Sequence, residues 1–309
     1  SIETIELLGG TFMNGNLRVK IKSWLDALRL RTLPLALASI SLGSFLAATE
    51  HAFQWRVALL CLTTAVLLQI LSNLANDYGD TLHGADSQHR QGPKRATQTG
   101  RISKGAMQAA IVFFAALTLF VGYQLIKQES LFFYAAGLAA MLAALAYTVG
   151  PNPYGYKGMG DPFVFVFFGI VGVFGSYFLQ THHLNLQVLW PAVSCGLFCV
   201  AVLNINNIRD MHSDKMAGKN TIPVRLGATR ARVYHWALMA GGFAAAVIYT
   251  LLNFNSPWQF LYLLVTPLLV LNGLAISAKT NPAHLDPYLR QMAVSTLFFS
   301  LTFGMGNLL

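Results

Sequence analysis

Long apolar runs alternate with short polar segments along the chain. A run of about 20 mostly apolar residues is long enough to cross a bilayer as a helix. Nine such runs are predicted to do so, near 33–49, 56–75, 106–126, 130–149, 162–180, 188–208, 233–253, 258–277 and 291–309. The pattern therefore predicts an all-α integral membrane protein with nine transmembrane helices.

The basic residues between these runs predict the orientation. With the N-terminus in the cytoplasm, every Lys and Arg except Arg56 and Lys127 falls in a cytoplasmic segment. Such a bias is typical of the cytoplasmic side of membrane proteins. We therefore expect a multi-pass protein of the bacterial cytoplasmic (inner) membrane, with the C-terminus outside.

Composition supports the membrane class. Only 11% of the residues are charged and 55% are hydrophobic, whereas a soluble domain has about 25% charged residues. The net charge of +9 is spread over short loops, which predicts membrane lipids and no nucleic acid as partners. The three cysteines, Cys61, Cys195 and Cys199, lie inside apolar runs and are interpreted as packing residues.

The end of the second apolar run carries the first candidate site. Asn73, Asn76, Asp77 and Asp80 are spaced i, i+3, i+4 and i+7, so a continuing helix would place them on one face. Carboxylate and amide oxygens there suit a hard divalent cation. An acid and three basic residues follow, namely Asp86, Arg90, Lys94 and Arg95, and the basic residues suit a phosphate.

The sixth apolar run ends in a similar way. Asn206, Asp210 and Asp214 are spaced i, i+4 and i+8, and Lys219 and Arg225 follow. Two facing carboxylate clusters would repel by about 4 kcal/mol for each like-charge pair at ~4 Å and an effective dielectric of about 20. Mg²⁺ would reverse that repulsion and attract a diphosphate, whose remaining oxygens Lys and Arg can bind. The two stretches are thus interpreted as two parts of one site at the cytoplasmic side.

Two further features each have two interpretations. In the Pro- and Gly-rich segment 150–161, Tyr154, Tyr156 and Lys157 could hold a substrate, with Asp161 orienting Lys157. They could equally form an interfacial tyrosine belt with a positive-inside lysine. Arg29 could reach the predicted substrate site, or it could anchor the first helix at lipid headgroups.

Four stretches together resemble the UbiA superfamily of intramembrane prenyltransferases. They are LRLRTLPLA (28–36), LLQILSNLANDYGD (67–80), YTVGPNPYGYKGMGD (147–161) and AVLNINNIRD (201–210). Within the superfamily, they are similar to the branch that acts on 1,4-dihydroxy-2-naphthoate in menaquinone synthesis. The resemblance runs from Trp24 to the C-terminus, so 24–309 is expected to be one transmembrane domain with pseudo-repeated halves around the Asp77 and Asp210 motifs. Residues 1–23 are expected to be an N-terminal extension.

The resemblance implies both a fold and a reaction. The helices would surround a central cavity, and a polyprenyl group would pass from polyprenyl diphosphate to 1,4-dihydroxy-2-naphthoate with loss of CO₂ and diphosphate. Mg²⁺ would be held by Asp77, Asp80, Asp86, Asp210 and Asp214. The superfamily pattern has an acid where this chain has Gly84, so Asp86 would replace it.

The remaining candidates follow from the same motifs. Tyr154 and Lys157 are expected to act with the aspartates in catalysis. Candidate substrate-binding residues are Asn73, Asn76, Arg29, Arg90, Lys94, Arg95, Asn207, Arg209, Lys219, Arg225, Tyr147 and Tyr156.

Other functions are compatible with parts of this pattern. The same fold could act on another aromatic acceptor, such as 4-hydroxybenzoate. Paired metals could also serve a hydrolase, because metal ions activate water. A divalent-cation or phosphate transporter would hold its site near the bilayer midplane, whereas both acidic clusters are predicted near one face.

Overall fold

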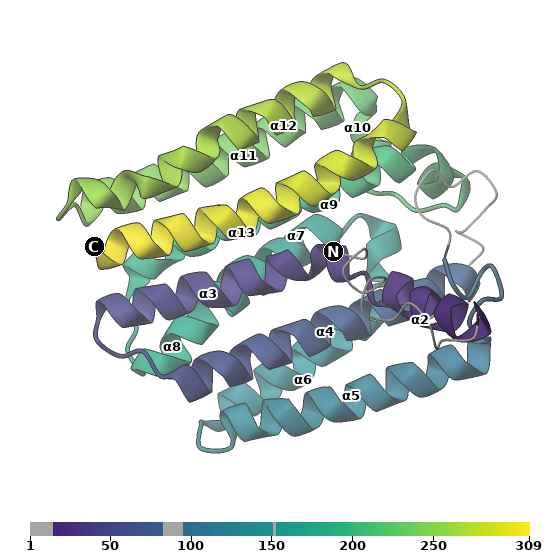
Figure 1. Cartoon of the computed structure of the whole chain (residues 1–309), viewed down its shortest axis with the longest axis horizontal. Coiled ribbons are helices and arrows are strands. Elements are labelled where there is room, and N and C mark those ends of the chain that lie inside the picture. Colours follow the sequence, from purple (N-terminus) through teal and green to yellow (C-terminus); the bar gives the residue numbers. More distant parts are fainter. Residues whose placement is uncertain (1–14, 83–94, 151–152) are drawn as a thin grey trace.

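The computed structural model describes residues 15–82, 95–150 and 153–309, and within these ranges every regular element is a helix. Figure 1 shows the helices running side by side in one elongated bundle. The principal elements are α2 (Gly15–Leu28), α3 (Leu33–Thr49), α4 (Trp55–Leu82), α5 (Lys104–Ile126), α6 (Leu131–Ala146), α7 (Gly160–Val164), η3 (Phe165–Phe174), α8 (Gly175–Thr181), α9 (Leu189–Met216), α10 (Ile222–Leu226), α11 (Ala228–Leu252), η5 (Pro257–Val265), α12 (Thr266–Ala278) and α13 (Asp286–Leu308). All nine predicted runs coincide with helical segments.

The membrane-spanning potential of these helices is uneven. Six helical segments in the described ranges are long and apolar enough to cross a bilayer, and the bent pair α2–α3 would be a seventh. The helix α6 has only 16 residues, and α13 mixes charged residues, Ser and Thr into its apolar sequence. The chain is thus an all-helical, multi-pass membrane protein. Nine spans with a cytoplasmic N-terminus remain a prediction.

The helix α9 forms the centre of the bundle. Most of its residues are buried, and α11, α13, α3 and the π-helical segment η3 pack around it. Small residues permit the closest approach: a Cβ added at Gly169 of η3 would lie 2.6 Å from the Ala192 carbonyl oxygen. The three cysteines are all buried, which confirms their interpretation as packing residues.

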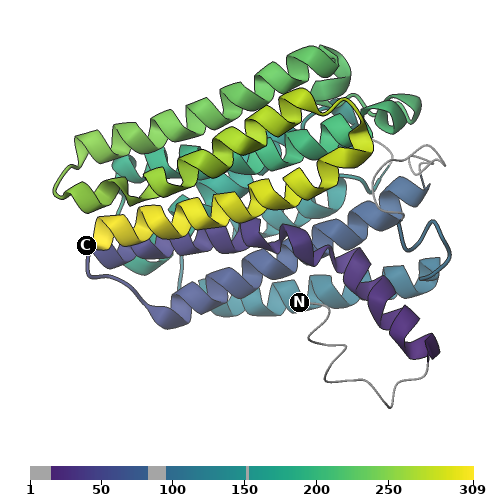
Figure 2. The ribbon, with the colours of Figure 1, turned by 45° about the horizontal axis from the view of Figure 1, so that its top comes forward.

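The polar ends of two central helices lie at the same end of the bundle. Figures 1 and 2 place the C-terminal ends of α4 and α9, the short helix α10 and the start of α13 together, opposite the C-terminus. Because α4 and α9 each carry their acidic residues in their last turns, the fold brings both acidic sequences to one end. The helix α2, which Figure 1 places near the same end, runs across the expected boundary between residues 23 and 24.

Candidate active site

The two carboxylates of α4 are buried and fully engaged by the segment that follows the helix. Asp77, only 3% exposed, accepts hydrogen bonds from the backbone N–H groups of Ala96 and Thr97, both at 3.1 Å. Asp80, 1% exposed, accepts from the Arg95 guanidinium and, at 2.9 Å, from the Tyr156 hydroxyl. Segment 95–97 therefore folds back onto the acidic turn and covers it.

The neighbouring asparagines tie α4 to other elements. The Asn73 side-chain amide donates to the Leu28 carbonyl at 3.1 Å, and the Asn76 amide oxygen accepts from the Thr148 hydroxyl at 2.7 Å. Gly79 is needed for this packing, because an added Cβ would lie 2.4 Å from the Thr148 carbonyl oxygen. The four polar residues of α4 thus contact different neighbours, and the asparagines position the helix.

On α9, Asp210 belongs to a buried ion-pair network. The Arg209 guanidinium is 1% exposed and donates twice to the Asp210 carboxylate, at 2.9 and 2.8 Å. It also donates to Asp286 on α13 at 2.6 Å and to the Asn206 amide oxygen at 2.8 Å. Arg209, a predicted substrate-binding residue, directs these hydrogen bonds to side chains of α9 and α13.

Lys219 connects the two acidic helices. Its ammonium lies 3.9 Å from the Asp80 carboxylate of α4, while its backbone N–H donates to the Asp214 carbonyl of α9 at 2.8 Å. The side chain is 10% exposed, and its ammonium lies over the rings of Tyr147 and Tyr156, 5.9 and 5.4 Å from their centroids. The two predicted half-sites therefore meet at this lysine.

The electrostatic surroundings keep Lys219 charged. Burial lowers the pKa of its ammonium, but the charges of Asp80 and Asp214 outweigh burial, and the net pKa is raised above its ordinary value. Two aromatic faces add a favourable interaction with the cation. Lys219 is thus a buried ammonium beside the Asp80 carboxylate, with its cationic form also favoured by the charge of Asp214.

Segment 153–161 differs from its expected arrangement. Tyr156 reaches the site, and its carbonyl accepts from the Asn220 N–H at 2.8 Å. The Tyr154 hydroxyl instead donates to the Ala143 carbonyl at 2.7 Å. Lys157 is exposed, and Asp161 accepts from the Tyr234 hydroxyl at 2.9 Å. The interpretation that Asp161 orients Lys157 is therefore wrong, because Tyr234 of α11 occupies that carboxylate.

The other predicted residues lie in various places. Arg225 is exposed and donates to the Lys157 carbonyl, Asn207 is buried on α9, and Arg29 lies at the joint between α2 and α3 with φ of 51°. Asp86, Arg90 and Lys94 lie outside the described residues.

Two functional contacts were missed by the sequence reasoning. Asp286 precedes a proline in the segment between two predicted spans, and the sequence analysis assigns it no role. Tyr234 lies in an apolar run and was read as part of a membrane helix. Neither carried a local signal, because their partners Arg209 and Asp161 are more than 70 positions away in the chain.

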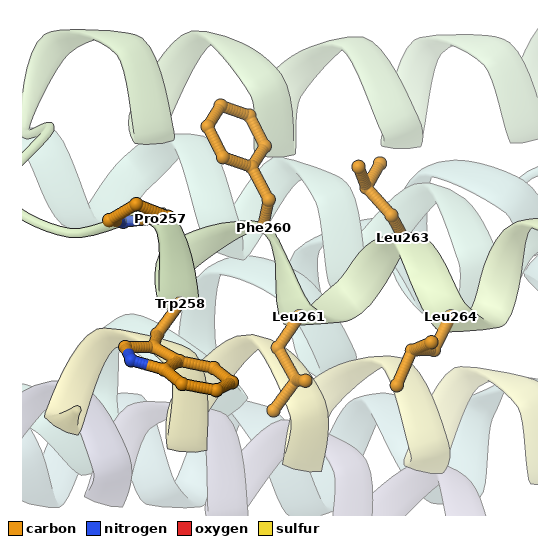
Figure 3. Close-up of a pocket in the computed structure, with 6 residues that line it drawn as sticks. All are labelled: Pro257, Trp258, Phe260, Leu261, Leu263 and Leu264. Carbon is orange, nitrogen blue, oxygen red and sulfur yellow. The ribbon is translucent and has the colours of Figure 1, made fainter.

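An apolar groove lies away from these residues. It has a volume of about 300 Å³ and is lined by side chains of η5, namely Pro257, Trp258, Phe260, Leu261, Leu263 and Leu264. Figure 3 shows the side chains of Trp258 and Leu261 pointing toward the yellow helix α13, and the side chain of Phe260 pointing away from α13. Its lining side chains carry no acid or base, so the groove offers no group for acid–base or phosphate chemistry.

The carboxylates suit a Mg²⁺ ion that also binds waters and substrate phosphates. Within the described ranges, no group of three or more His, Cys, Asp or Glu side chains is close enough to hold a metal ion. Mg²⁺, however, usually binds one or two carboxylates, waters and substrate phosphates rather than an all-protein cage. Asp77 and Asp80 on α4, and Asp210 and Asp214 on α9, are the residues that would hold it in this way, and Lys219 lies 3.9 Å from Asp80.

Fold and site together define a helical membrane protein with carboxylates and buried cations gathered at one end of its bundle. The chain belongs to the UbiA prenyltransferase family, whose model matches residues 36–301.

The most informative relatives are bacterial enzymes. The 1,4-dihydroxy-2-naphthoate octaprenyltransferases of Haemophilus influenzae and Escherichia coli are each 42% identical to this chain, over 94% and 93% of it and 97% and 95% of their own lengths. Among solved structures, a UbiA homologue from Aeropyrum pernix matches with a TM-score of 0.66 and 17% identity over 90% of this chain and 97% of its own. A homologue from Archaeoglobus fulgidus bound to GPP and Mg²⁺ matches with a TM-score of 0.65 and 17% identity, over 93% and 99%. These structures support the fold.

Proposed function

We propose that this protein transfers a polyprenyl group from polyprenyl diphosphate to 1,4-dihydroxy-2-naphthoate, with loss of CO₂ and diphosphate, as a step of menaquinone synthesis. The observation that carries the acceptor assignment is the 42% identity to two octaprenyltransferases of that name over nearly the whole chain. The buried cations beside paired carboxylates support the diphosphate half of the reaction.

The bond changes follow from the substrates. The allylic C–O bond to the diphosphate breaks, and its electron pair leaves with the diphosphate. The ring carbon that bears the carboxylate forms the new C–C bond, and the C–C bond to the carboxylate then breaks to release CO₂. The electron pair of that bond restores the aromatic ring, so no external oxidant or reductant is needed.

The protein's own groups would favour ionisation of the diphosphate. Mg²⁺, held by Asp77 and Asp80 on one helix and Asp210 and Asp214 on the other, would supply positive charge to the leaving oxygens. Lys219, together with Arg95, lies beside Asp80 and would bind the remaining phosphate oxygens. Charge placed in advance at the leaving group, in a site of low dielectric, lowers the barrier to its departure.

The aromatic residues offer a place for the acceptor and the allylic cation. Tyr147 and Tyr156 already present their faces to the Lys219 ammonium. Such faces also stabilise a carbocation. The Tyr156 hydroxyl donates a hydrogen bond to Asp80. Tyr156 would therefore link the part of the site that holds the acceptor to the part that holds the metal.

The topology completes the proposal. The active site would lie at the cytoplasmic face of a bacterial inner membrane, with nine spanning helices, residues 24–309 as one domain and the lipid-like prenyl chain inside the bilayer. Asp86, Arg90 and Lys94 would add ligands for the metal and the diphosphate.

A direct assay tests the function. Purified protein is incubated with a polyprenyl diphosphate, 1,4-dihydroxy-2-naphthoate and Mg²⁺, and CO₂ and diphosphate are measured. We expect both to be released in equal amounts. Product with 4-hydroxybenzoate but none with the naphthoate would assign the other acceptor, and transport of phosphate without any product would refute the enzyme altogether.

A further inference from the structure

The helix α2 carries an apolar stripe that the bundle does not cover. Leu17, Ile21 and Leu25 are spaced i, i+4 and i+8, so they share one side of the helix, and they are 48%, 42% and 39% exposed. Ser23 and Ala27, on a different side, are buried against the bundle. Figure 2 shows α2 extending outward from the remaining helices.

Basic residues border this stripe. Arg18 and Lys22 lie one turn apart beside it, and Lys20 lies on its other flank; all three are exposed. Asp26 is the acidic residue of α2, and Arg101 binds it at 3.0 Å. A partner that binds this side of α2 therefore needs an apolar layer for the stripe and negative charges for the basic residues that border it.

The neighbouring elements show that α2 lies where the chain passes from a charged helix to an apolar one. It meets α3 at a bend of 49°, next to Arg29, whose φ of 51° interrupts the helix. The helix α3 contains no charged residue, whereas α2 has four between Arg18 and Asp26. An apolar stripe flanked by Lys and Arg is typical of helices that lie in the membrane interface.

We propose that α2 docks onto the anionic phospholipid surface of the membrane in which the bundle sits, and that this docking supports the active site. A second copy of the chain is a poorer partner, because symmetric contact between two such stripes would bring the rows of Arg18 and Lys22 toward each other.

The structure contains a direct connection from α2 to the acidic turn of α4. Ala27 packs in one cluster with Ala96 and Ile102, and Asp26 binds Arg101 in the same segment. The backbone N–H of Ala96 donates to the Asp77 carboxylate. A firmly docked α2 would therefore steady the segment that orients Asp77, whereas an undocked α2 would leave it with fewer contacts.

Docking can be measured without any assay of activity. The native cysteines are buried, so Ile21→Cys can be labelled with an environment-sensitive fluorophore in the full-length protein. Val19→Cys, on the polar side of α2 and 60% exposed, is the matched control. Both are reconstituted in vesicles of phosphatidylcholine alone or with about 30 mol % phosphatidylglycerol, and quenching by brominated lipid is recorded.

We expect position 21 to be quenched strongly with phosphatidylglycerol, weakly without it, and position 19 little in either. Each basic residue near an anionic surface strengthens its attraction about fivefold, so Lys20→Gln/Lys22→Gln should raise the phosphatidylglycerol content needed for quenching. Lys104→Gln/Arg230→Gln removes two exposed basic residues elsewhere and should change nothing. Equal quenching at both positions, no effect of phosphatidylglycerol, or quenching that instead follows self-association of the protein would overturn the docking.

A second measurement tests the link to the site and rests on the proposed function. We expect phosphatidylglycerol to raise kcat/KM of the unmodified protein, and to do so less for Lys20→Gln/Lys22→Gln, with equal rates in phosphatidylcholine alone. Docking with identical kinetics in both vesicles would refute the link to Asp77. Absence of any product would refute the proposed function and leave the quenching result standing.

Discussion

Replacing Arg209 with methionine would decide whether this residue binds substrate or positions Asp210. The guanidinium is 1% exposed and makes four hydrogen bonds to three side chains. Methionine has a similar length but no donor. Asp210, 3% exposed, would lose the guanidinium that donates to both of its oxygens, and breaking such a buried pair costs about 3–5 kcal/mol. We expect a loss of stability of that size.

Asp286 provides the comparison. Its side chain is 37% exposed, so water screens its interaction with Arg209, and Asp286→Asn should cost about 1 kcal/mol or less. Because both changes act on one guanidinium, the double variant should be less destabilised than the sum of the two. Arg209→Lys keeps the charge but not the two-pronged geometry, and it should lie between the wild type and Arg209→Met.

The assay is the free energy of unfolding in mixed micelles, with KM for the prenyl diphosphate measured on the same preparations. Arg230→Met, at an exposed arginine of α11, controls for loss of one positive charge. The reasoning would be refuted if Arg209→Met were as stable as Arg230→Met and differed only in a raised KM. Arg209 would then be the substrate ligand that the sequence motif implied.

Three further predictions concern the other groups of the site. Asp77→Asn should abolish most product formation, because one oxygen that accepts from Ala96 or Thr97 becomes a donor and a metal ligand is weakened; near-wild-type turnover at saturating Mg²⁺ would contradict this. Lys219→Ala should raise KM for the prenyl diphosphate about tenfold, the loss of about 1.4 kcal/mol of charge-assisted binding, and an unchanged KM would exclude its role. Chelation with EDTA should stop turnover and Mg²⁺ should restore it, whereas activity that persists in EDTA would contradict a metal site at the aspartates.

Sequence patterns predicted the helices well, because the apolar run that favours each helix lies within that helix. The first run was expected at 33–49, and α3 has these bounds. The sixth apolar run was expected to end near 208, and α9 continues to Met216, because polar residues that are partly buried extend the helix beyond its apolar part. The five-residue helix α10 was missed because it is too short to show a period.

The candidate site was only partly predictable, because sequence spacing describes one helix at a time. The spacing of Asp77 and Asp80 correctly indicated that the second helix continues through both acids, as α4 does. It could not show the three hydrogen bonds that join distant parts of the chain. These are Thr148 to Asn76, Tyr234 to Asp161, and Arg209 to Asp286. These pairs are made by the packing of α4, α9, α11 and α13 against one another. A single sequence holds no local trace of such contacts.

The arrangement of charges suggests how the site would exchange partners. Asp80 is bound by Arg95 and lies near Lys219, so Mg²⁺ binding at Asp80 would compete with both cations for the same oxygens. A bound diphosphate would offer Arg95 and Lys219 new negative charge in place of the Asp80 carboxylate. The charges of Asp80 and Asp214 raise the pKa of Lys219, which favours its cationic form at a phosphate. Lys219 would therefore bind the leaving group without any proton transfer, and its loss should affect diphosphate binding more than the chemistry at the aromatic ring.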